Sequence, residues 1–131
     1  ICRKLKSVDI PEGVETLGLD AFGECLRLQS VILPSTLRTI SRGVFWKCKS
    51  LKKITIPASV ETIGEYAFFH CDSLKHVYNY STEPQPLSVI FNRKDITIHV
   101  PAASVEKYRK AQHWRDMNIV AMRDEEIMDE R

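Results

Sequence analysis

The sequence lacks most features that mark enzymes and membrane proteins. Its 131 residues include only five glycines, and the glycine-dependent motifs of phosphate-binding loops and nucleophile elbows, G-x-x-x-x-G-K-[ST] and G-x-S-x-G, do not occur. The zinc-protease motif H-E-x-x-H is also missing. No apolar run approaches the roughly 18 residues that a membrane-spanning helix needs. We therefore expect a protein that is not an enzyme and does not span a membrane.

Excess charge of one sign is also missing. The net charge is only +2, and nucleic-acid-binding proteins usually carry a much denser basic stripe, so no nucleic-acid partner is expected. The chain is 44% hydrophobic and 27% charged, which excludes disorder, collagen and a coiled coil. It begins with neither Met nor a signal-peptide layout, and we interpret it as a piece of a longer protein.

A repeat dominates the sequence, with the same residue types returning at every 23rd position. The recurring columns are Cys2/Cys25/Cys48/Cys71, Leu5/Leu28/Leu51/Leu74, Val8/Val31/Ile54/Val77, Pro11/Pro34/Pro57 and Phe22/Phe45/Phe68. A unit of this length with a single strand cannot bury its own apolar edge, so the copies must stack on one another. The sequence therefore predicts a solenoid.

Each copy reads Cys-x-x-Leu-x-x-Val-x-Ile-Pro, followed by a turn and Val-x-x-Ile-Gly-x-x-Ala-Phe. The first part alternates like a strand with one buried face, and proline ends it because proline cannot donate to a β-ladder. The Val-x-x-Ile part is either a second short strand or an extended segment, and Ala-Phe-x-x-Cys is expected to form a tight helical turn. Gly18 and Gly64 are expected at positive φ, where Ser41 in the middle copy would be strained.

The repeat ends irregularly. Asn79 stands where a strand isoleucine is expected, and the strand ending returns at Pro101, two residues early. Ser104 is expected to cap a short helix whose apolar face includes Tyr108, with Trp114 beyond it, as a lid over the open core. The predicted parts are the repeats over 1–80, an irregular terminal coil and C-terminal cap over 81–123, and an acidic tail over 124–131.

Residues 2–78 resemble the BspA-like leucine-rich repeats, whose consensus is the pattern just described. Residues 98–108, with Trp114 and Ile119, resemble the C-terminal segment common in bacterial members. The resemblance implies an α/β repeat fold, a right-handed leucine-rich-repeat solenoid with a parallel β-sheet on its concave face and a C-terminal cap. It also implies a bacterial cell-surface or secreted protein, from a family linked to adhesion to host proteins and to other bacteria.

The four cysteines are interpreted first as a ladder of free buried thiols, because one cysteine per coil at one position stacks small side chains in the core. A disulfide between neighbouring coils is the next alternative, although parallel Cβ vectors make it awkward. Zinc is the third, since His70, Cys71 and His76 are close in sequence, but the paired spacing of structural zinc sites is missing. No metal and no cofactor are expected.

The outward side of the predicted strands is the first candidate binding surface, because strand residues alternate between the core and solvent. Its residues are Lys52, Lys53, Thr55, Lys75, His76 and Tyr78. They would form a basic patch with one aromatic ring, suited to an acidic protein surface or a sulfated glycan. The alternative is a strand face that is polar only because it is solvated.

Trp46 and Phe69 are a second candidate, since they share one column just after the core phenylalanine. They are either stacked exposed rings that contact a sugar or a protein, or half-buried rings packed against neighbouring turns or a further coil. The predicted function is non-catalytic recognition of a host or bacterial surface protein or glycan, at the cell surface or outside the cell. The alternative is a structural spacer, and the oligomeric state stays open.

Overall fold

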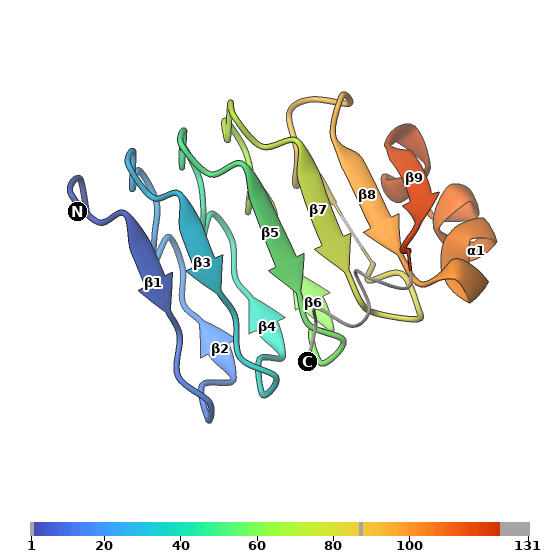
Figure 1. Ribbon diagram of the computed structural model, residues 1–131, viewed down its shortest axis with the longest axis horizontal. Helices are drawn as coiled ribbons and strands as arrows, with labels where there is room; N and C mark the ends of the chain where they lie inside the picture. Colours follow the sequence, from blue (N-terminus) through green and yellow to red (C-terminus); the bar gives the residue numbers. More distant parts are fainter. Residues whose placement is uncertain (1, 87, 124–131) are drawn as a thin grey trace.

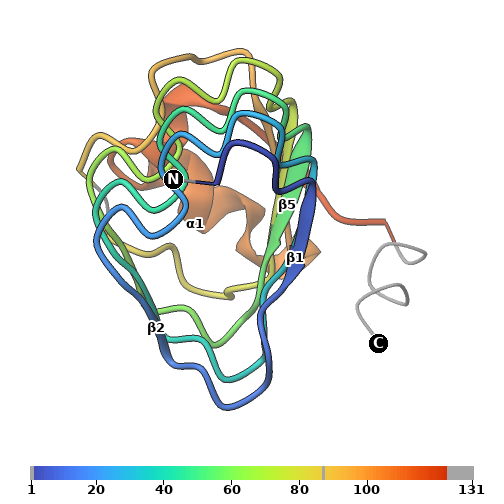
Figure 2. The ribbon, with the colours of Figure 1, turned by 90° about the vertical axis from the view of Figure 1, so that its left-hand side faces the viewer.

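A computed structural model describes residues 2–86 and 88–123 of the chain; the predicted acidic tail at 124–131 lies outside them. The strands are β1 (Ser7–Asp9), β2 (Thr16–Leu17), β3 (Ser30–Ile32), β4 (Thr39–Ile40), β5 (Lys53–Ile56), β6 (Thr62–Ile63), β7 (His76–Asn79), β8 (Thr97–Val100) and β9 (Asn118–Ala121). The helices are η1 (Ala102–Ser104), α1 (Val105–Lys110) and η2 (Trp114–Asp116). Seen from the N-terminal end, each coil runs down the side of β1 and returns along the side of β2 (Figure 2). The chain is a right-handed leucine-rich-repeat solenoid.

Two sides of the solenoid carry parallel sheets. Strands β1-β3 and β5-β7-β8-β9 follow one another along the first side (Figure 1), and β2-β4-β6 form a sheet along the second. The Val-x-x-Ile segment is thus a second short strand. The pairing Val8↔Val31 and Ile54↔Val77 keeps the step of the sequence repeat, because each coil must place the same apolar residue at the same point in the core.

The terminal coil is shorter, as the sequence predicts. Tyr78 pairs with His99, so the step between these strands is two residues shorter than the regular repeat. Asn79 does not interrupt β7: its buried amide donates to Gln85 Oε1 at 2.8 Å, and its Oδ1 accepts from the N–H of Ser81 at 3.2 Å. A buried polar side chain in an isoleucine position is therefore satisfied by local partners.

The third side consists of turns. Ala-Phe-x-x-Cys forms no helix; the N–H of Cys48 bonds back to the carbonyl of Phe45 at 3.1 Å, while the N–H of Phe45 reaches Ala67 O in the next coil at 2.9 Å. The rings behind these turns stack in order, with centroids 5.8 Å apart for Phe22–Phe45, 5.5 Å for Phe45–Phe68 and 5.6 Å for Phe68–Phe91. An aromatic ladder thus runs along the core.

The prediction that Gly18 and Gly64 have positive φ is wrong, and so is the expected strain at Ser41. Among residues 2–86 and 88–123, the glycines with positive φ are Gly13 and Gly43. Gly64 is needed for close packing instead: a Cβ there would lie 2.7 Å from the carbonyl carbon of Ser41 and 2.8 Å from Arg42 Cα. The Gly64 N–H reaches the previous coil at 2.7 Å, whereas the Ser41 N–H does so at 3.1 Å. The side chain at position 41 therefore accompanies a wider gap between coils.

We expect Gly64→Ala to lower the free energy of unfolding by about 1–3 kcal/mol, because the added methyl group must push two coils apart. Gly18→Ala is the matched control, since a Cβ at this equivalent position meets nothing within 4 Å, and we expect it to be neutral or slightly stabilising. Urea unfolding followed by circular dichroism measures both. Equal effects of the two substitutions would contradict the close-packing explanation.

The expectation of four free thiols is wrong at two positions. Cys2 and Cys25 form a disulfide with Cα atoms 4.9 Å apart, a separation at which stacked coils permit a bridge. Cys48 and Cys71 are free and buried. Their thiols donate to the carbonyls of Phe22 and Phe45, each at 3.1 Å. The ladder is therefore half disulfide and half hydrogen-bonded thiols.

The cap closes the C-terminal end of the core, as predicted. Tyr108 and Trp114 are fully buried with their rings edge-on at 5.3 Å. The Trp114 indole donates to Gln85 O at 2.9 Å and the Tyr108 hydroxyl to Ser81 O at 2.7 Å. Burial raises the pKa of Tyr108. Ser104 precedes α1 but its hydroxyl does not cap the helix; it donates to Thr82 O at 2.7 Å and so ties the cap to the irregular connection.

Candidate binding surface

Strands β1, β3, β5, β7, β8 and β9 follow one another along one side of the solenoid (Figure 1). We call the surface of their outward side chains the strand face. Two columns make it up: Ser7, Ser30, Lys53, His76, Thr97 and Asn118, and beside them Asp9, Ile32, Thr55, Tyr78, His99 and Val120. The alternating strands bury the residues between these columns, such as Ile54 and Val77. The face becomes basic and aromatic toward the C-terminal coils.

The predicted basic residues lie together. Lys52, Lys53, Lys75 and His76 line one open hollow of about 500 Å³, with Asp72 and Ser73 at its side. Lys75 is partly neutralised by Asp95, whose carboxylate lies 3.6 Å away. Among the described residues, neither Lys52 nor Lys53 has an acidic group within ion-pair distance. Two unpaired ammonium groups therefore face solvent at this hollow.

An aromatic group adjoins the lysines. The rings of Tyr78 and His99 are stacked, with centroids 4.2 Å apart and planes at 17°. His76 Nδ1 lies 2.9 Å from His99 Nε2, so the two imidazoles share a hydrogen bond whose direction depends on their tautomers. Thr55 is exposed and pairs with Tyr78 across β5 and β7. The predicted strand-face residues thus form one contiguous surface.

His99 is absent from the sequence-based prediction. The regular 23-residue step would place Pro101, and not His99, opposite Tyr78 in the terminal coil. The observed step is shorter, and the early return of Pro101 contains this signal. Counting back from that proline would have placed His99 beside Tyr78.

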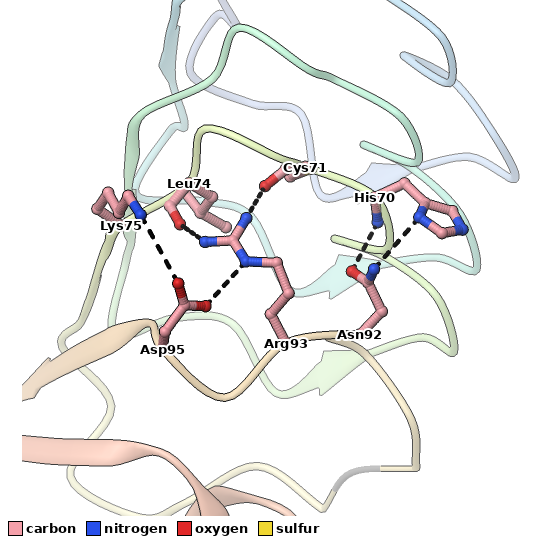
Figure 3. Close-up of polar contacts among 7 residues, drawn as sticks. All are labelled: His70, Cys71, Leu74, Lys75, Asn92, Arg93 and Asp95. Carbon is pink, nitrogen blue, oxygen red and sulfur yellow. Dashed lines mark hydrogen bonds and ion pairs between the residues drawn. The ribbon is translucent and has the colours of Figure 1, made fainter.

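A side chain of the terminal coil bonds to backbone carbonyls of the preceding coil next to the basic hollow (Figure 3). Arg93 donates to the carbonyls of Cys71 at 2.7 Å and Leu74 at 2.6 Å, and to the Asp95 carboxylate at 2.9 Å. The hydrogen bond from Arg93, with the added charge of Lys75, holds the pKa of Asp95 below its usual value. Asp95 therefore stays ionised and keeps Lys75 oriented beside the strand face.

At the edge of the turn side, the Asn92 side chain takes the place of a backbone carbonyl as the acceptor for His70. In the preceding coil the N–H of Lys47 donates to the backbone carbonyl of Phe69 at 2.8 Å. At the equivalent position the His70 N–H donates to Asn92 Oδ1 at 2.8 Å, and Asn92 Nδ2 lies 3.2 Å from His70 Nδ1. His70 therefore joins its own coil to the shorter terminal coil through these contacts with Asn92.

Trp46 and Phe69 are half-buried, which agrees with the second of the two alternatives for this column. Lys47 Nζ lies over the Trp46 ring at 4.6 Å from its centroid. Phe69 packs edge-on against Tyr66 at 5.0 Å and against His70 at 5.3 Å. Trp46 lines one hollow, together with Tyr66, and Phe69 lines another. The two residues thus belong to different parts of the turn side.

Within residues 2–86 and 88–123, no group of three or more His, Cys, Asp or Glu side chains is arranged to hold a metal ion. In the same part of the chain, no helix has the length and apolar character to cross a bilayer.

Comparisons with known proteins agree with this architecture. The crystal structure of the pneumococcal vaccine antigen PcpA is similar with a TM-score of 0.65 at 20% identity, over 91% of this chain and 36% of that one. A leucine-rich repeat protein from Bacteroides ovatus ATCC 8483 is similar with a TM-score of 0.50 at 26% identity, over 75% of this chain and 32% of that one. This chain therefore spans about a third of the length of each.

None of the curated protein sequences compared with this chain matches it. A family model does match: the BspA type leucine rich repeat region, in six copies, covers residues 1–109. This range includes the coils that carry the basic hollow and the Tyr78–His99 stack. The chain belongs to the BspA-type leucine-rich repeat family.

Proposed function

We propose that this chain is a non-catalytic recognition module whose strand face binds an acidic partner, a surface protein or a sulfated glycan. The observation that carries the proposal is the hollow between the unpaired ammonium groups of Lys52 and Lys53 and the side chains of Lys75 and His76. These groups project from a stacked, hydrogen-bonded scaffold, so binding a ligand orders the lysine side chains but does not have to order the backbone. A solenoid commonly binds through an extended face of this kind.

The Tyr78–His99 stack adds a flat surface beside the charges. Aromatic groups contribute contact area at little conformational cost, while lysines alone would attract any anion. The combination favours a partner that presents both anionic groups and a flat or apolar surface. Nucleic acid is not the proposed partner, because the basic residues form a local cluster and not a long stripe.

The proposed location is the surface of a bacterial cell or the medium outside it. Membership of the BspA-type family supports this. The similarity to PcpA, described as a pneumococcal vaccine antigen, supports it as well. Neither of the two similar structures is named as an enzyme, which is in keeping with a binding role.

We expect the protein to bind a member of a panel of host matrix proteins and sulfated glycans, with DNA duplex as a further probe. The variant Lys53→Glu/His76→Ala/Tyr78→Ala should weaken that binding about ten-fold or more, because it reverses one charge and removes two rings at the centre of the surface. Added salt should weaken it as well, since exposed charges are screened. Surface plasmon resonance measures both effects.

Lys110→Glu is the matched control, because it makes the same change of formal charge on α1, away from the two strand-face columns. It should leave binding almost unchanged. Equal loss in both variants would mean that net charge alone drives association. Failure of every panel member to bind would contradict the proposal and favour a structural spacer.

A further inference from the structure

A second hollow lies on the turn side, and its origin is a missing side chain. Asp20, Gly43 and Tyr66 occupy one column with φ of 55°, 69° and 61°. Each donates its N–H to the next coil, at 3.0, 3.0 and 2.7 Å respectively. Because the middle residue has no side chain, an open space of about 470 Å³ remains between its two neighbours. This volume falls within the range of small-molecule sites.

Glycine fits the floor of this hollow for two reasons. It adopts the left-handed backbone without the cost that Asp20 and Tyr66 bear in the same column. A Cβ at Gly43 would also collide with the carboxylate of Asp20 and lie 4.0 Å from Trp46 Cβ. The Asp20 carboxylate therefore extends over the glycine and into the hollow.

The walls are aromatic. Trp46 and Tyr66 both line the space, and Leu19, which is 68% exposed, stands at its rim. Tyr66 is supported from behind by the edge of Phe69 at 5.0 Å. An exposed leucine beside two half-buried rings gives the hollow apolar surface for a ligand to cover.

The polar groups are an acceptor and a donor that do not neutralise each other. Asp20 and Arg42 both line the hollow. Among the described residues, the Asp20 carboxylate has no ion-pair or hydrogen-bond partner, and the Arg42 guanidinium lies over the Tyr66 ring, 5.5 Å from its centroid. Both side chains can therefore form paired hydrogen bonds to a ligand.

The geometry points to a saccharide site, in which Trp46 contacts the apolar C–H face of a pyranose ring, Tyr66 holds the Arg42 guanidinium in place, and Asp20 and Arg42 bind the hydroxyl groups. A carboxylate accepts from two neighbouring hydroxyls, and a guanidinium donates to two oxygens. A neutral sugar suits a hollow that carries one charge of each sign. The site shares no residue with the basic hollow of the strand face and stands independently of the proposed function.

The test uses the two tryptophans of the chain. Trp46 lines the hollow and Trp114 is fully buried in the cap, so a ¹H–¹⁵N spectrum contains one indole signal that reports on the site and one internal control. Methyl pyranosides of glucose, galactose, mannose, fucose and N-acetylglucosamine are titrated into the millimolar range. We expect at least one to shift the Trp46 signal to saturation while the Trp114 signal stays in place; the variant Trp46→Phe assigns the signals.

The variant Asp20→Asn/Arg42→Gln should weaken this binding about ten-fold or more, through loss of charge-assisted hydrogen bonds. Glu15→Gln/Arg27→Gln makes the same changes of charge at exposed positions outside the hollow and should retain the affinity. The strand-face triple variant should also retain it, which separates the two sites. The inference is overturned if no sugar shifts the Trp46 signal to saturation, or if the shift survives in the Asp20/Arg42 variant.

Discussion

Trp114→Ala is expected to lower the free energy of unfolding by about 3–5 kcal/mol, the range for truncating a large buried aromatic residue. The indole is fully buried and lies 5.3 Å from the Tyr108 ring and 6.3 Å from Phe91, the last ring of the aromatic ladder. Its N–H also satisfies Gln85 O at 2.9 Å. Removing it opens a cavity between the cap and the terminal coil and leaves that carbonyl without this donor.

Urea unfolding measures the loss, and Arg115→Ala is the control, because Arg115 is the exposed neighbour of Trp114 in η2. The control should change the free energy of unfolding by less than about 0.5 kcal/mol. Trp114→Phe should fall between the two, since it retains an aromatic ring but loses the donor to Gln85. A loss below about 1 kcal/mol in Trp114→Ala would show that the cap contributes little to closing the core.

The second prediction concerns how fast the two free thiols, Cys48 and Cys71, react with an alkylating reagent. Burial raises the pKa of Cys48 and of Cys71 from 9.0 to about 12. A raised pKa keeps the thiol protonated, so at neutral pH the reactive thiolate is about a thousand-fold scarcer than for an ordinary cysteine. We expect iodoacetamide to leave the native protein unmodified at pH 8. After denaturation without a reductant, two cysteines should react, and after reduction all four.

Intact-mass measurement counts the labels, and peptide mapping identifies the labelled residues. Four labels without reductant would contradict the Cys2–Cys25 disulfide and restore the ladder of free thiols. Labelling of Cys48 or Cys71 in the folded protein would show that the core opens more readily than the structure implies. The Cys48→Ser and Cys71→Ser variants assign each label.

Most of the fold could be predicted from the sequence because the repeat is regular. A constant period that returns cysteine, leucine, valine and phenylalanine to the same columns requires stacked coils, and alternation within Leu51, Ile54 and Ile56 separates the buried side of a strand from the outward one. Burial of these columns follows from the hydrophobic effect acting on each coil in the same way. The lid formed by Tyr108 and Trp114 followed from the apolar spacing in the last segment.

The candidate sites could be predicted only in part. Lys53 of β5 and His76 of β7 belong to one outward column that alternation reveals, but His99 comes from a coil of different length. The hollow at Gly43 was missed because it depends on which side chain is absent from a column, and on Asp20 and Tyr66 in the coils on either side. The sequence did offer Trp46 as a candidate contact for a sugar or a protein, but not the left-handed backbone of Asp20, Gly43 and Tyr66 that shapes the hollow.

The sequence by itself determined the repeat, the solenoid and which residues of each strand point outward, because these follow from periodicity within one coil. The tertiary structure alone decided three other matters: the Cys2–Cys25 bond, the packing role of Gly64, and the hollows lined by Lys53 and by Trp46. All three depend on distances between neighbouring coils, and a few tenths of an ångström separate the contact at Gly64 from that at Ser41. Sequence columns specify which residues meet across coils, whereas the packing of the whole stack sets how closely they meet.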